Sequence, residues 1–251
     1  MMTDDIKTIN DYQKQIYLDF EKDTTQKLLD LYGAVLQKTK QLETLKILDI
    51  GGAGGFFAYA LSDYFSDKTC EIYVLDTMEY PTWTTYSKKI TFIKNSADNL
   101  NKLFDEYTFD LVFANRVFHH FVRNSWKKSI DGMADILKQI RYCLKLNGFF
   151  CVVDLTYDGF LYDKITSKLI YTLTSLKSSS AAFVFRALGA KTAGVGVCFL
   201  SKNMMLDLFT RADFQLETYV EDSETYIHWY QNILLLCRKM RANALFICKK
   251  G

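Results

Sequence analysis

Four glycines lie within five residues of one another, directly after a short apolar run that contains an aspartate. They are Gly51, Gly52, Gly54 and Gly55, and the aspartate is Asp49. Glycine adopts positive φ at little cost and lets a ligand approach the main chain closely. Such a cluster between a buried strand and a helix predicts a ligand-binding turn at the carboxyl end of a strand.

A second carboxylate, Asp76, ends the next apolar run, 21 residues after Gly55. At the end of a strand it can accept hydrogen bonds from both hydroxyls of a ribose, which indicates an adenosine-containing cofactor. A dinucleotide site would require the pattern G-x-G-x-x-G, with the pyrophosphate at the helix N-terminus. That pattern fits poorly, because Ala53 replaces the middle glycine and Phe56 the last one.

Two adjacent histidines, His119 and His120, follow another apolar run and are two of the three histidines in the chain. An unperturbed imidazole has a pKa near ~6.5, so it can accept a proton at neutral pH. We expect His120 to pack beneath a cofactor or to cap a helix. For His119 two alternatives are open: it acts as general base, or methyl transfer needs only alignment of the reactants and no base. Asn115 is either a turn residue or the place where the main chain meets the cofactor.

The elements that must position these residues are short apolar runs separated by helical patterns. Strands are predicted at residues 46–50, 71–76, 90–94, 109–114, 149–155, 214–221 and 244–248. Strands that alternate with helices imply a mostly parallel sheet covered on both faces.

The clearest helix is predicted between the fourth and fifth strands. Its apolar positions run from Trp126 to Leu144 in steps of three and four residues, which is one continuous helical stripe. Asn124 or Ser125 can cap its start. Asn147 and Gly148 are expected to end it in a left-handed turn.

Residues 49–55 resemble the first motif of class I S-adenosylmethionine-dependent methyltransferases. In that family an acidic strand residue precedes glycines at alternate positions, which here are Asp49, Gly51, Ala53 and Gly55. Asp76 matches the family's acidic residue at the end of the second strand. The resemblance extends over roughly residues 45 to 155.

Three further segments carry the same resemblance. Residues 92–97 resemble the segment that borders the adenine, with Ser96 where an aspartate is common. Residues 109–121 are similar to the fourth-strand motif with its paired histidines. Residues 144–150 are similar to the turn before the fifth strand, with Asn147 where proline or glycine is usual.

The resemblance implies an α/β fold with a Rossmann-like, seven-stranded, mostly parallel sheet and helices on both faces. N-terminal helices and a helical lid insertion would be added to it. It implies S-adenosylmethionine as cofactor, S-adenosylhomocysteine as product and no metal, with His119 and His120 as catalytic candidates and His119 facing the acceptor. The cofactor-binding candidates are Asp49, Gly51, Gly52, Ala53, Gly55, Asp76, Thr77, Ser96, Ala97, Asn115 and Arg116.

The chain is expected to divide into a helical segment at 1–42, a cofactor-binding core at 43–155, a lid insertion at 156–200 and a C-terminal part at 201–251. A second insertion is expected at 222–243. Both insertions leave carboxyl ends of strands, so we expect them to cover the cofactor face. Candidate acceptor-wall residues are Tyr157, Tyr162, Tyr226, His228 and Trp229.

Composition narrows the function further. A net charge of +2 gives no strong field for nucleic acid, and no apolar segment is typical of a signal peptide or a membrane span. Six cysteines without C-x-x-C spacing favour reduced thiols in a cytoplasmic protein. A monomer or homodimer is expected.

The leading hypothesis is methyl transfer to a small-molecule acceptor, at a hydroxyl, in secondary-metabolite or sugar biosynthesis. The alternatives are N- or C-methylation of a small molecule, an RNA methyltransferase, a non-catalytic S-adenosylmethionine-binding protein and a nicotinamide dehydrogenase. The segment after the fourth strand is not the N/D-P-P-Y motif that accompanies methylation of base amines, and the dehydrogenase is opposed by the motif spacing.

Overall fold

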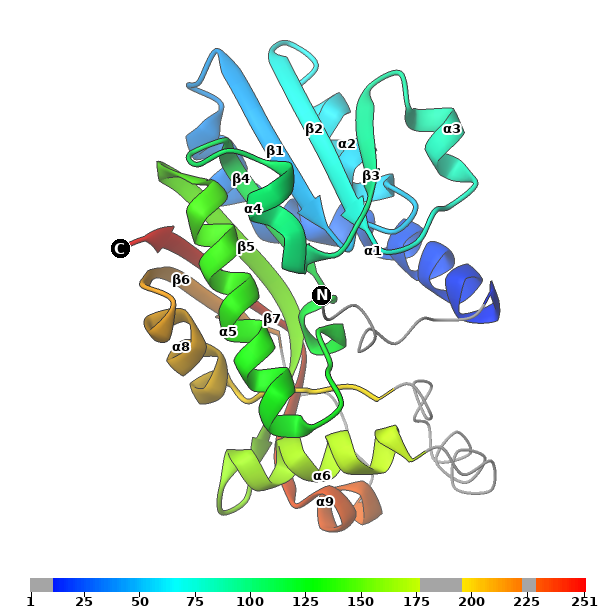
Figure 1. Ribbon diagram of the computed structural model, residues 1–251, viewed down its shortest axis with the longest axis vertical. Coiled ribbons are helices and arrows are strands. Elements are labelled where there is room, and N and C mark those ends of the chain that lie inside the picture. Colours follow the sequence, from blue (N-terminus) through cyan, green and yellow to red (C-terminus); the bar gives the residue numbers. More distant parts are fainter. Residues whose placement is uncertain (1–10, 177–195, 223–228) are drawn as a thin grey trace.

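A seven-stranded sheet forms the centre of the computed structural model, which describes residues 11–176, 196–222 and 229–251 (Figure 1). The strand order is β3-β2-β1-β4-β5-β7-β6, and β7 alone runs antiparallel to its neighbours. The predicted α/β class and mostly parallel sheet are confirmed. The strands are β1 Thr44–Ile50, β2 Thr69–Asp76, β3 Ile90–Lys94, β4 Phe109–Asn115, β5 Leu144–Gly159, β6 Phe214–Glu221 and β7 Cys237–Lys250.

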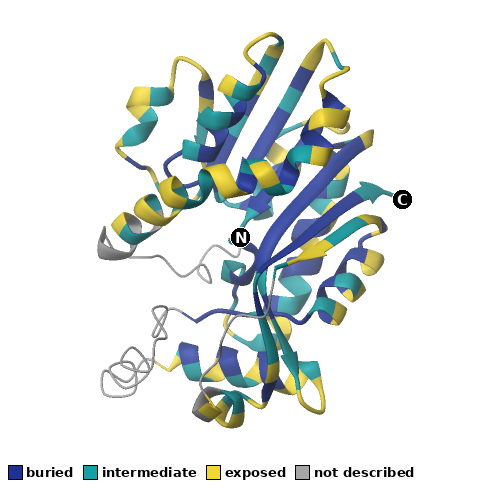
Figure 2. Cartoon of the chain, turned by 180° about the vertical axis from the view of Figure 1, so that it is seen from behind, coloured by how far each residue is buried: buried dark blue, intermediate teal, exposed yellow. Residues whose placement is uncertain are grey.

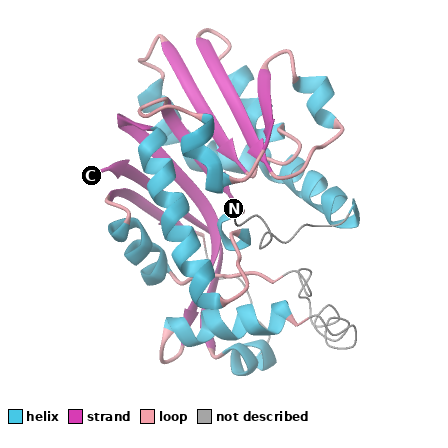
Figure 3. Ribbon diagram, viewed as in Figure 1, coloured by secondary structure: helices cyan, strands magenta, loops and turns pink. Residues whose placement is uncertain are grey.

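Helices cover both faces of this sheet (Figure 3). One face carries α1 and α2, and the other carries α4, α5 and α8. Within residues 11–42, the described part of the expected N-terminal helical segment, the chain forms one long helix, α1. The helices are α1 Asp11–Thr39, α2 Phe56–Tyr64, α3 Thr82–Tyr86, α4 Leu100–Leu103, α5 Trp126–Cys143, α6 Asp163–Ser175, α8 Lys202–Arg211 and α9 Trp229–Leu235, with 3-10 turns η1 Ala97–Asn99 and η2 Phe118–His120. None of the helices described is long and apolar enough to cross a membrane.

The central strands are mostly apolar because both of their faces are buried (Figure 2). In β4, Leu111 and Phe113 belong to the core beneath α1 and α2, whereas Val112 and Ala114 belong to the core beneath α5. Successive side chains on a strand point to opposite faces, so each core receives every second residue.

Helix α5 begins where the sequence pattern predicts, but it ends earlier than predicted. The Ser125 hydroxyl caps the helix by accepting a hydrogen bond from the Lys128 amide at 3.2 Å. The predicted left-handed turn at Asn147 and Gly148 is wrong, because α5 ends at Cys143 and the chain enters β5 directly. A register shift between β4 and β5 absorbs these residues, and a Cβ at Gly148 would lie 3.0 Å from the Asp110 carbonyl oxygen.

The final strand is longer than its pattern predicts, beginning at Cys237 instead of residue 244. Residues 156–159 of β5 pair with residues 237–241 of β7, forming a two-stranded arm that carries α6 and α9 beyond the main sheet (Figure 1). Arg238 and Lys239 break the apolar pattern of this arm, so hydropathy does not indicate a strand there. Within the described residues of the predicted insertion at 222–243, the helix is the short α9.

A test of the packing beneath α5 is the substitution Leu137→Ala. Leu137 is fully buried in the core between α5 and the sheet. Its truncation should lower the free energy of unfolding by about 2–5 kcal/mol, through lost apolar burial and a cavity. Urea denaturation measures this loss. The control is Lys138→Ala, a change at the neighbouring exposed residue, which should alter the free energy of unfolding by about 0.5 kcal/mol or less. A Leu137→Ala protein as stable as the control would contradict this packing.

Candidate functional site

Two adjoining cavities lie at the carboxyl edge of the sheet, where β1, β2 and β4 end. They share Gly51, Asp76, Thr77, Val117 and His120. The first, here called the glycine-loop cavity, is lined by Phe20, Glu21, Thr24, Leu28, Asp49, Gly51, Gly52, Ala53, Phe57, Asp76, Thr77, Tyr80, Asn115, Arg116, Val117 and His120. The second, the Asp98 cavity, adds Ile50, Leu75, Asn95, Ser96, Ala97, Asp98, Phe121, Val122 and Arg123 to the shared residues. All eleven predicted cofactor-binding residues except Gly55 line one or both cavities.

The glycines after β1 are required by backbone conformation and by close contacts. Gly51 and Gly55 have φ of +69° and +80°, which glycine adopts readily. A Cβ at Gly51 would lie 2.3 Å from Val117 Cγ2, and one at Gly52 would lie 2.4 Å from Asp49 Oδ2. The loop therefore keeps the floor of the glycine-loop cavity free of side chains.

Ala53, which departs from the glycine pattern, also adopts positive φ, at +36°. Its amide donates a hydrogen bond to Asp76 Oδ2 at 3.1 Å, and its carbonyl accepts one from Trp83 Nε1 at 2.7 Å. These contacts hold the main chain on both sides of the residue. The loop thus retains its shape although alanine pays a steric cost in this region.

Asp49 is buried at the end of β1, with 1 % of its surface exposed. Its Oδ1 accepts a long hydrogen bond of 3.5 Å from Asn115 Nδ2, while Asn115 Oδ1 accepts one of 2.5 Å from the Tyr32 hydroxyl. Asp49 Oδ2 has no hydrogen-bond partner within the described structure. Burial, followed by repulsion from Glu21, raises the pKa of Asp49 well above its usual range.

Asp76 lies between the two cavities and lines both. Its carboxylate accepts hydrogen bonds from the amides of Ala53, at 3.1 Å, and Met78, at 3.0 Å. Burial raises its pKa to about 6, although these amides oppose the shift. The carboxylate joins the glycine loop to the end of β2 and still offers acceptor capacity to a ligand.

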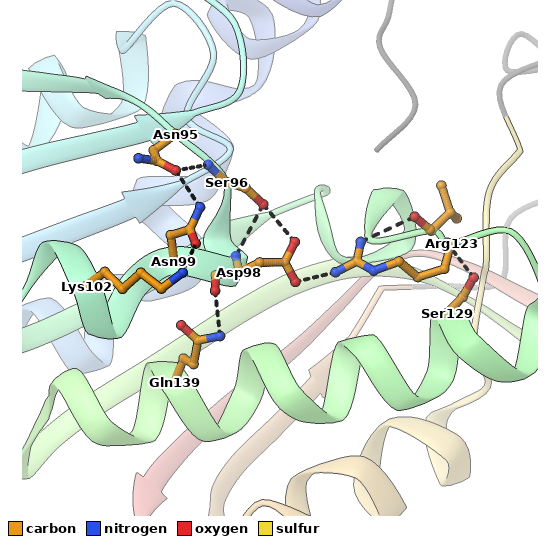
Figure 4. Close-up of polar contacts among 9 residues, drawn as sticks. Asn95, Ser96, Asp98, Asn99, Lys102, Arg123, Ser129 and Gln139 are labelled. Carbon is orange, nitrogen blue, oxygen red and sulfur yellow. Dashed lines mark hydrogen bonds and ion pairs between the residues drawn. The ribbon is translucent and has the colours of Figure 1, made fainter. Parts of the chain in front are cut away.

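The Asp98 cavity is bounded by a polar network (Figure 4). The Ser96 hydroxyl accepts a hydrogen bond from the Asp98 amide and donates one to Asp98 Oδ2. The other Asp98 oxygen forms an ion pair with the Arg123 guanidinium. The Ser96 side chain is thus engaged as a cap of η1, and the nearest carboxylate in this cavity is that of Asp98, two residues further along.

The paired histidines occupy different surroundings. His120 lines both cavities, and burial lowers its pKa well below the usual range, so it is neutral. His119 is 7 % exposed; its Nδ1 lies 2.6 Å from Asp154 Oδ1, and its amide donates to Asp154 Oδ2 at 3.0 Å. The two rings lie 4.1 Å apart between centroids. The His119–Asp154 pair thus lies directly beside the histidine that lines both cavities.

The predicted acceptor-wall residues are spread over the molecule. Tyr157 packs against Phe199, at 4.9 Å between ring centroids, and Phe199 in turn stacks on His119 at 4.5 Å. Tyr162 and Trp229 are 70 % and 72 % exposed on the arm, and neither lines the two cavities. Tyr226 and His228 lie outside the described residues.

Arg116 is the basic side chain, other than His120, that lines the glycine-loop cavity. Its φ is +52°, and its guanidinium lies over the Phe20 ring at 4.6 Å and donates to Asn243 Oδ1. It therefore connects the end of β4 with α1 and β7 at the edge of the cavity.

Three acidic residues of this region were not predicted. Glu21 of α1 accepts hydrogen bonds from the amides of Gly54, at 2.9 Å, and Phe57, at 3.2 Å. Nothing distinguishes Glu21 or Asp98 from other surface-type carboxylates in the sequence, since tertiary packing brings them to the site. Asp154 could have been found, because it is the one charged residue in the apolar run 149–155.

No group of three or more histidine, cysteine, aspartate or glutamate side chains suited to a metal ion occurs among the residues placed by the structure.

Comparison with known proteins identifies the central part of the chain. Residues 48–152 match the model of a family described as a methyltransferase domain. No curated protein matches the chain in sequence.

Many solved structures share the fold, at low sequence identity. A SAM-dependent methyltransferase from Aquifex aeolicus is 12% identical, covers 97% of this chain and 100% of its own, and superposes with a TM-score of 0.57. The cyclase SpnF is 12% identical, with 88% and 80% covered and a TM-score of 0.57. The mitomycin 7-O-methyltransferase MmcR is 15% identical, with 82% and 49% covered and a TM-score of 0.51.

The strained alanine of the loop gives a direct test of the site's backbone. Ala53→Gly should leave stability unchanged or raise it by up to about 1 kcal/mol, because glycine relieves the positive φ. Ala60→Gly, in the middle of α2, is the matched control and should lower stability by about 1 kcal/mol. Thermal and urea unfolding measure both. Equal losses in the two variants would show that Ala53 does not hold a left-handed conformation.

Proposed function

The chain carries a class I S-adenosylmethionine-dependent methyltransferase domain, and from this premise we propose that it methylates a hydroxyl of a small-molecule acceptor, with His119 as the general base. The observation that carries the proposal is the buried His119–Asp154 pair, which packs against a histidine lining the cofactor cavity.

The residues of the two cavities fit S-adenosylmethionine. Gly51 and Gly52 have no room for a Cβ, which would clash with Val117 and Asp49, so the main chain itself is exposed to a ligand there, and Asp49 presents a buried oxygen without a partner. When bound, the cofactor supplies a methyl group that is activated by its positively charged sulfur. We assign its amino-acid end to the glycine loop, with Asp49, Asn115 and the Arg116 guanidinium around it.

The ribose and adenine are assigned to the second half of the site. Asp76 lies between the cavities and can accept the ribose hydroxyls, with Thr77 beside it. The Asp98 cavity, with the Ala97 main chain, would take the adenine. We propose that Asp98 provides the carboxylate there, because the Ser96 hydroxyl is engaged in capping η1.

The hydrogen bond between His119 and Asp154 determines which imidazole nitrogen of His119 can accept a proton. A carboxylate only accepts hydrogen bonds, so Asp154 fixes the proton of neutral His119 on Nδ1 and leaves Nε2 as the acceptor. An acceptor hydroxyl would transfer its proton to Nε2 as its oxygen attacks the methyl group. Asp154 would then stabilise the resulting imidazolium, as in other oriented histidine bases.

The surroundings of His119 support a small acceptor. The imidazole is 7 % exposed, and the Phe199 ring stacks on it with Tyr157 behind. Aromatic surroundings of this kind exclude water from the imidazole and would suit a compact, partly apolar substrate. Because a cyclase shares the fold, the decisive readout is transfer of a labelled methyl group.

Asp76→Ala tests the cofactor assignment. Loss of a buried carboxylate that holds the ribose should weaken S-adenosylmethionine binding by about 10-fold or more, as expected for a charged hydrogen-bond partner. Titration calorimetry measures the affinity. Glu79→Ala, an exposed change in the same segment, should bind like the parent protein. Equal affinities of parent protein and Asp76→Ala would refute the ribose assignment.

His119→Ala and Asp154→Asn test the proposed base. Transfer of labelled methyl groups to a panel of hydroxylated small molecules first identifies an acceptor. His119→Ala should then lower kcat by about 100-fold or more. Asp154→Asn should also lower it, since an amide cannot accept from both His119 Nδ1 and the His119 main chain.

Cofactor affinity separates this role from misfolding. Both variants should bind S-adenosylmethionine within about 3-fold of the parent protein, because neither residue lines the two cavities. Full methyl transfer by His119→Ala across the pH range would rule out the base.

A further inference from the structure

The glycine-loop cavity is lined by more carboxyl groups than the assigned contacts require. Its lining includes the carboxylates of Glu21, Asp49 and Asp76 and one guanidinium, that of Arg116. Asp76 is assigned to the ribose and Asp49 to the amino-acid end of the cofactor. Glu21 has no role in that assignment.

Glu21 reaches the glycine-loop cavity from helix α1 and not from a strand of the sheet. It lies on α1, and its two carboxylate oxygens accept hydrogen bonds from the amides of Gly54 and Phe57, at 2.9 and 3.2 Å. These amides belong to the glycine loop and to the first turn of α2, where main-chain donors lack intrahelical partners. The carboxylate is therefore fixed in place beside the cavity.

A second observation shows that the cavity is incomplete without a ligand. Asp49 Oδ2 is buried and has no hydrogen-bond partner, and Asp49 itself is 1 % exposed. An unpaired buried acceptor is costly unless a donor or a cation satisfies it. The ammonium of the amino-acid end, which both forms of the cofactor carry, would satisfy Asp49, so any discrimination between the two forms falls to Glu21.

We propose that Glu21 makes this cavity select the positively charged cofactor over the neutral product. In S-adenosylmethionine the ammonium and carboxylate cancel, and the sulfonium leaves a net charge of +1. S-adenosylhomocysteine lacks the sulfonium charge. A fixed carboxylate in a poorly solvated cavity attracts a net cation much more strongly than a zwitterion. The inference rests on the assignment of this cavity to the cofactor.

The selectivity has a consequence for turnover. Methyl transfer converts the sulfonium into a neutral thioether, so the attraction to Glu21 falls at the moment the product forms. Release of S-adenosylhomocysteine is thereby favoured, and inhibition by the product is reduced.

The charge state of Glu21 makes the effect depend on pH. Burial raises the pKa of Glu21 to about 7, and repulsion from Asp76 adds to the shift. The other titratable or charged groups that face it are Asp49, Asp76, Tyr86, Arg116 and His120. Since a bound cation lowers the pKa of Glu21, binding releases a proton, and affinity for the cofactor should rise from pH 6 to pH 8.

Glu21→Gln tests the proposal, with calorimetric titration of S-adenosylmethionine and S-adenosylhomocysteine at pH 8. The affinity for S-adenosylmethionine should fall by about 10-fold, and that for S-adenosylhomocysteine by about 2-fold or less. Asp23→Asn, an exposed change of the same charge on the same helix, should alter neither affinity.

A second measurement follows the pH dependence. Between pH 6 and 8 the affinity of the parent protein for S-adenosylmethionine should rise more steeply than that of Glu21→Gln. The ligand's own titration is common to both proteins and cancels in this comparison. Thermal unfolding reports any loss of the hydrogen bonds to α2.

The outcomes separate the possibilities. Equal weakening of both ligands, together with a lower melting temperature, would mean that Glu21 only caps α2 and would overturn the proposal. An unchanged ratio of affinities or an unchanged pH slope would overturn it as well. If the parent protein bound neither ligand, the cofactor assignment would fail and this inference with it, whereas binding by the parent protein leaves the Glu21 comparison as an independent test.

Discussion

Burial of carboxylates where the parallel strands end is the constraint on which the site depends. Asp49 and Asp76 close β1 and β2, and Asp154 lies near the end of the sheet part of β5. A buried carboxylate must be hydrogen-bonded or paired, or else it takes up a proton. Asp76 is met by main-chain amides and Asp154 by His119, whereas one oxygen of Asp49 has no partner among the described residues.

The surrounding helices supply side chains that position these carboxylates or add to them. Helix α1 packs on the sheet through Tyr32, whose ring contacts Phe57 and Phe113 and whose hydroxyl holds Asn115 against Asp49. The same helix brings Glu21 to the start of α2. The N-terminal helix therefore supplies hydrogen-bond partners to the glycine loop and to the polar groups that line the glycine-loop cavity.

The two adjacent histidines have different surroundings at this edge of the sheet. His120 lies on the cavity side and is kept neutral by burial, whereas His119 is turned toward Asp154 on β5. Phe199, which precedes α8, covers His119, and the Cys198 amide donates to the His119 carbonyl at 2.9 Å. The end of the segment predicted as a lid insertion, residues 198–199, thus contributes to the surroundings of the proposed base.

The sequence by itself determined the sheet and half of the site. The apolar runs, the glycine cluster, Asp49, Asp76 and the paired histidines follow from local patterns, because buried strands and tight turns each restrict residue type over a few positions. The places of Glu21 and Asp98 in the site, the pairing of Asp154 with His119, and the separate surroundings of His119 and His120 were decided by the tertiary structure alone. Their sequence separation is large, and a carboxylate becomes a site residue only when packing removes it from water and places it beside amides or an imidazole. The polar arm formed by β5 and β7 could not be predicted for a related reason, since its strands are fixed by pairing between distant residues and not by apolar periodicity.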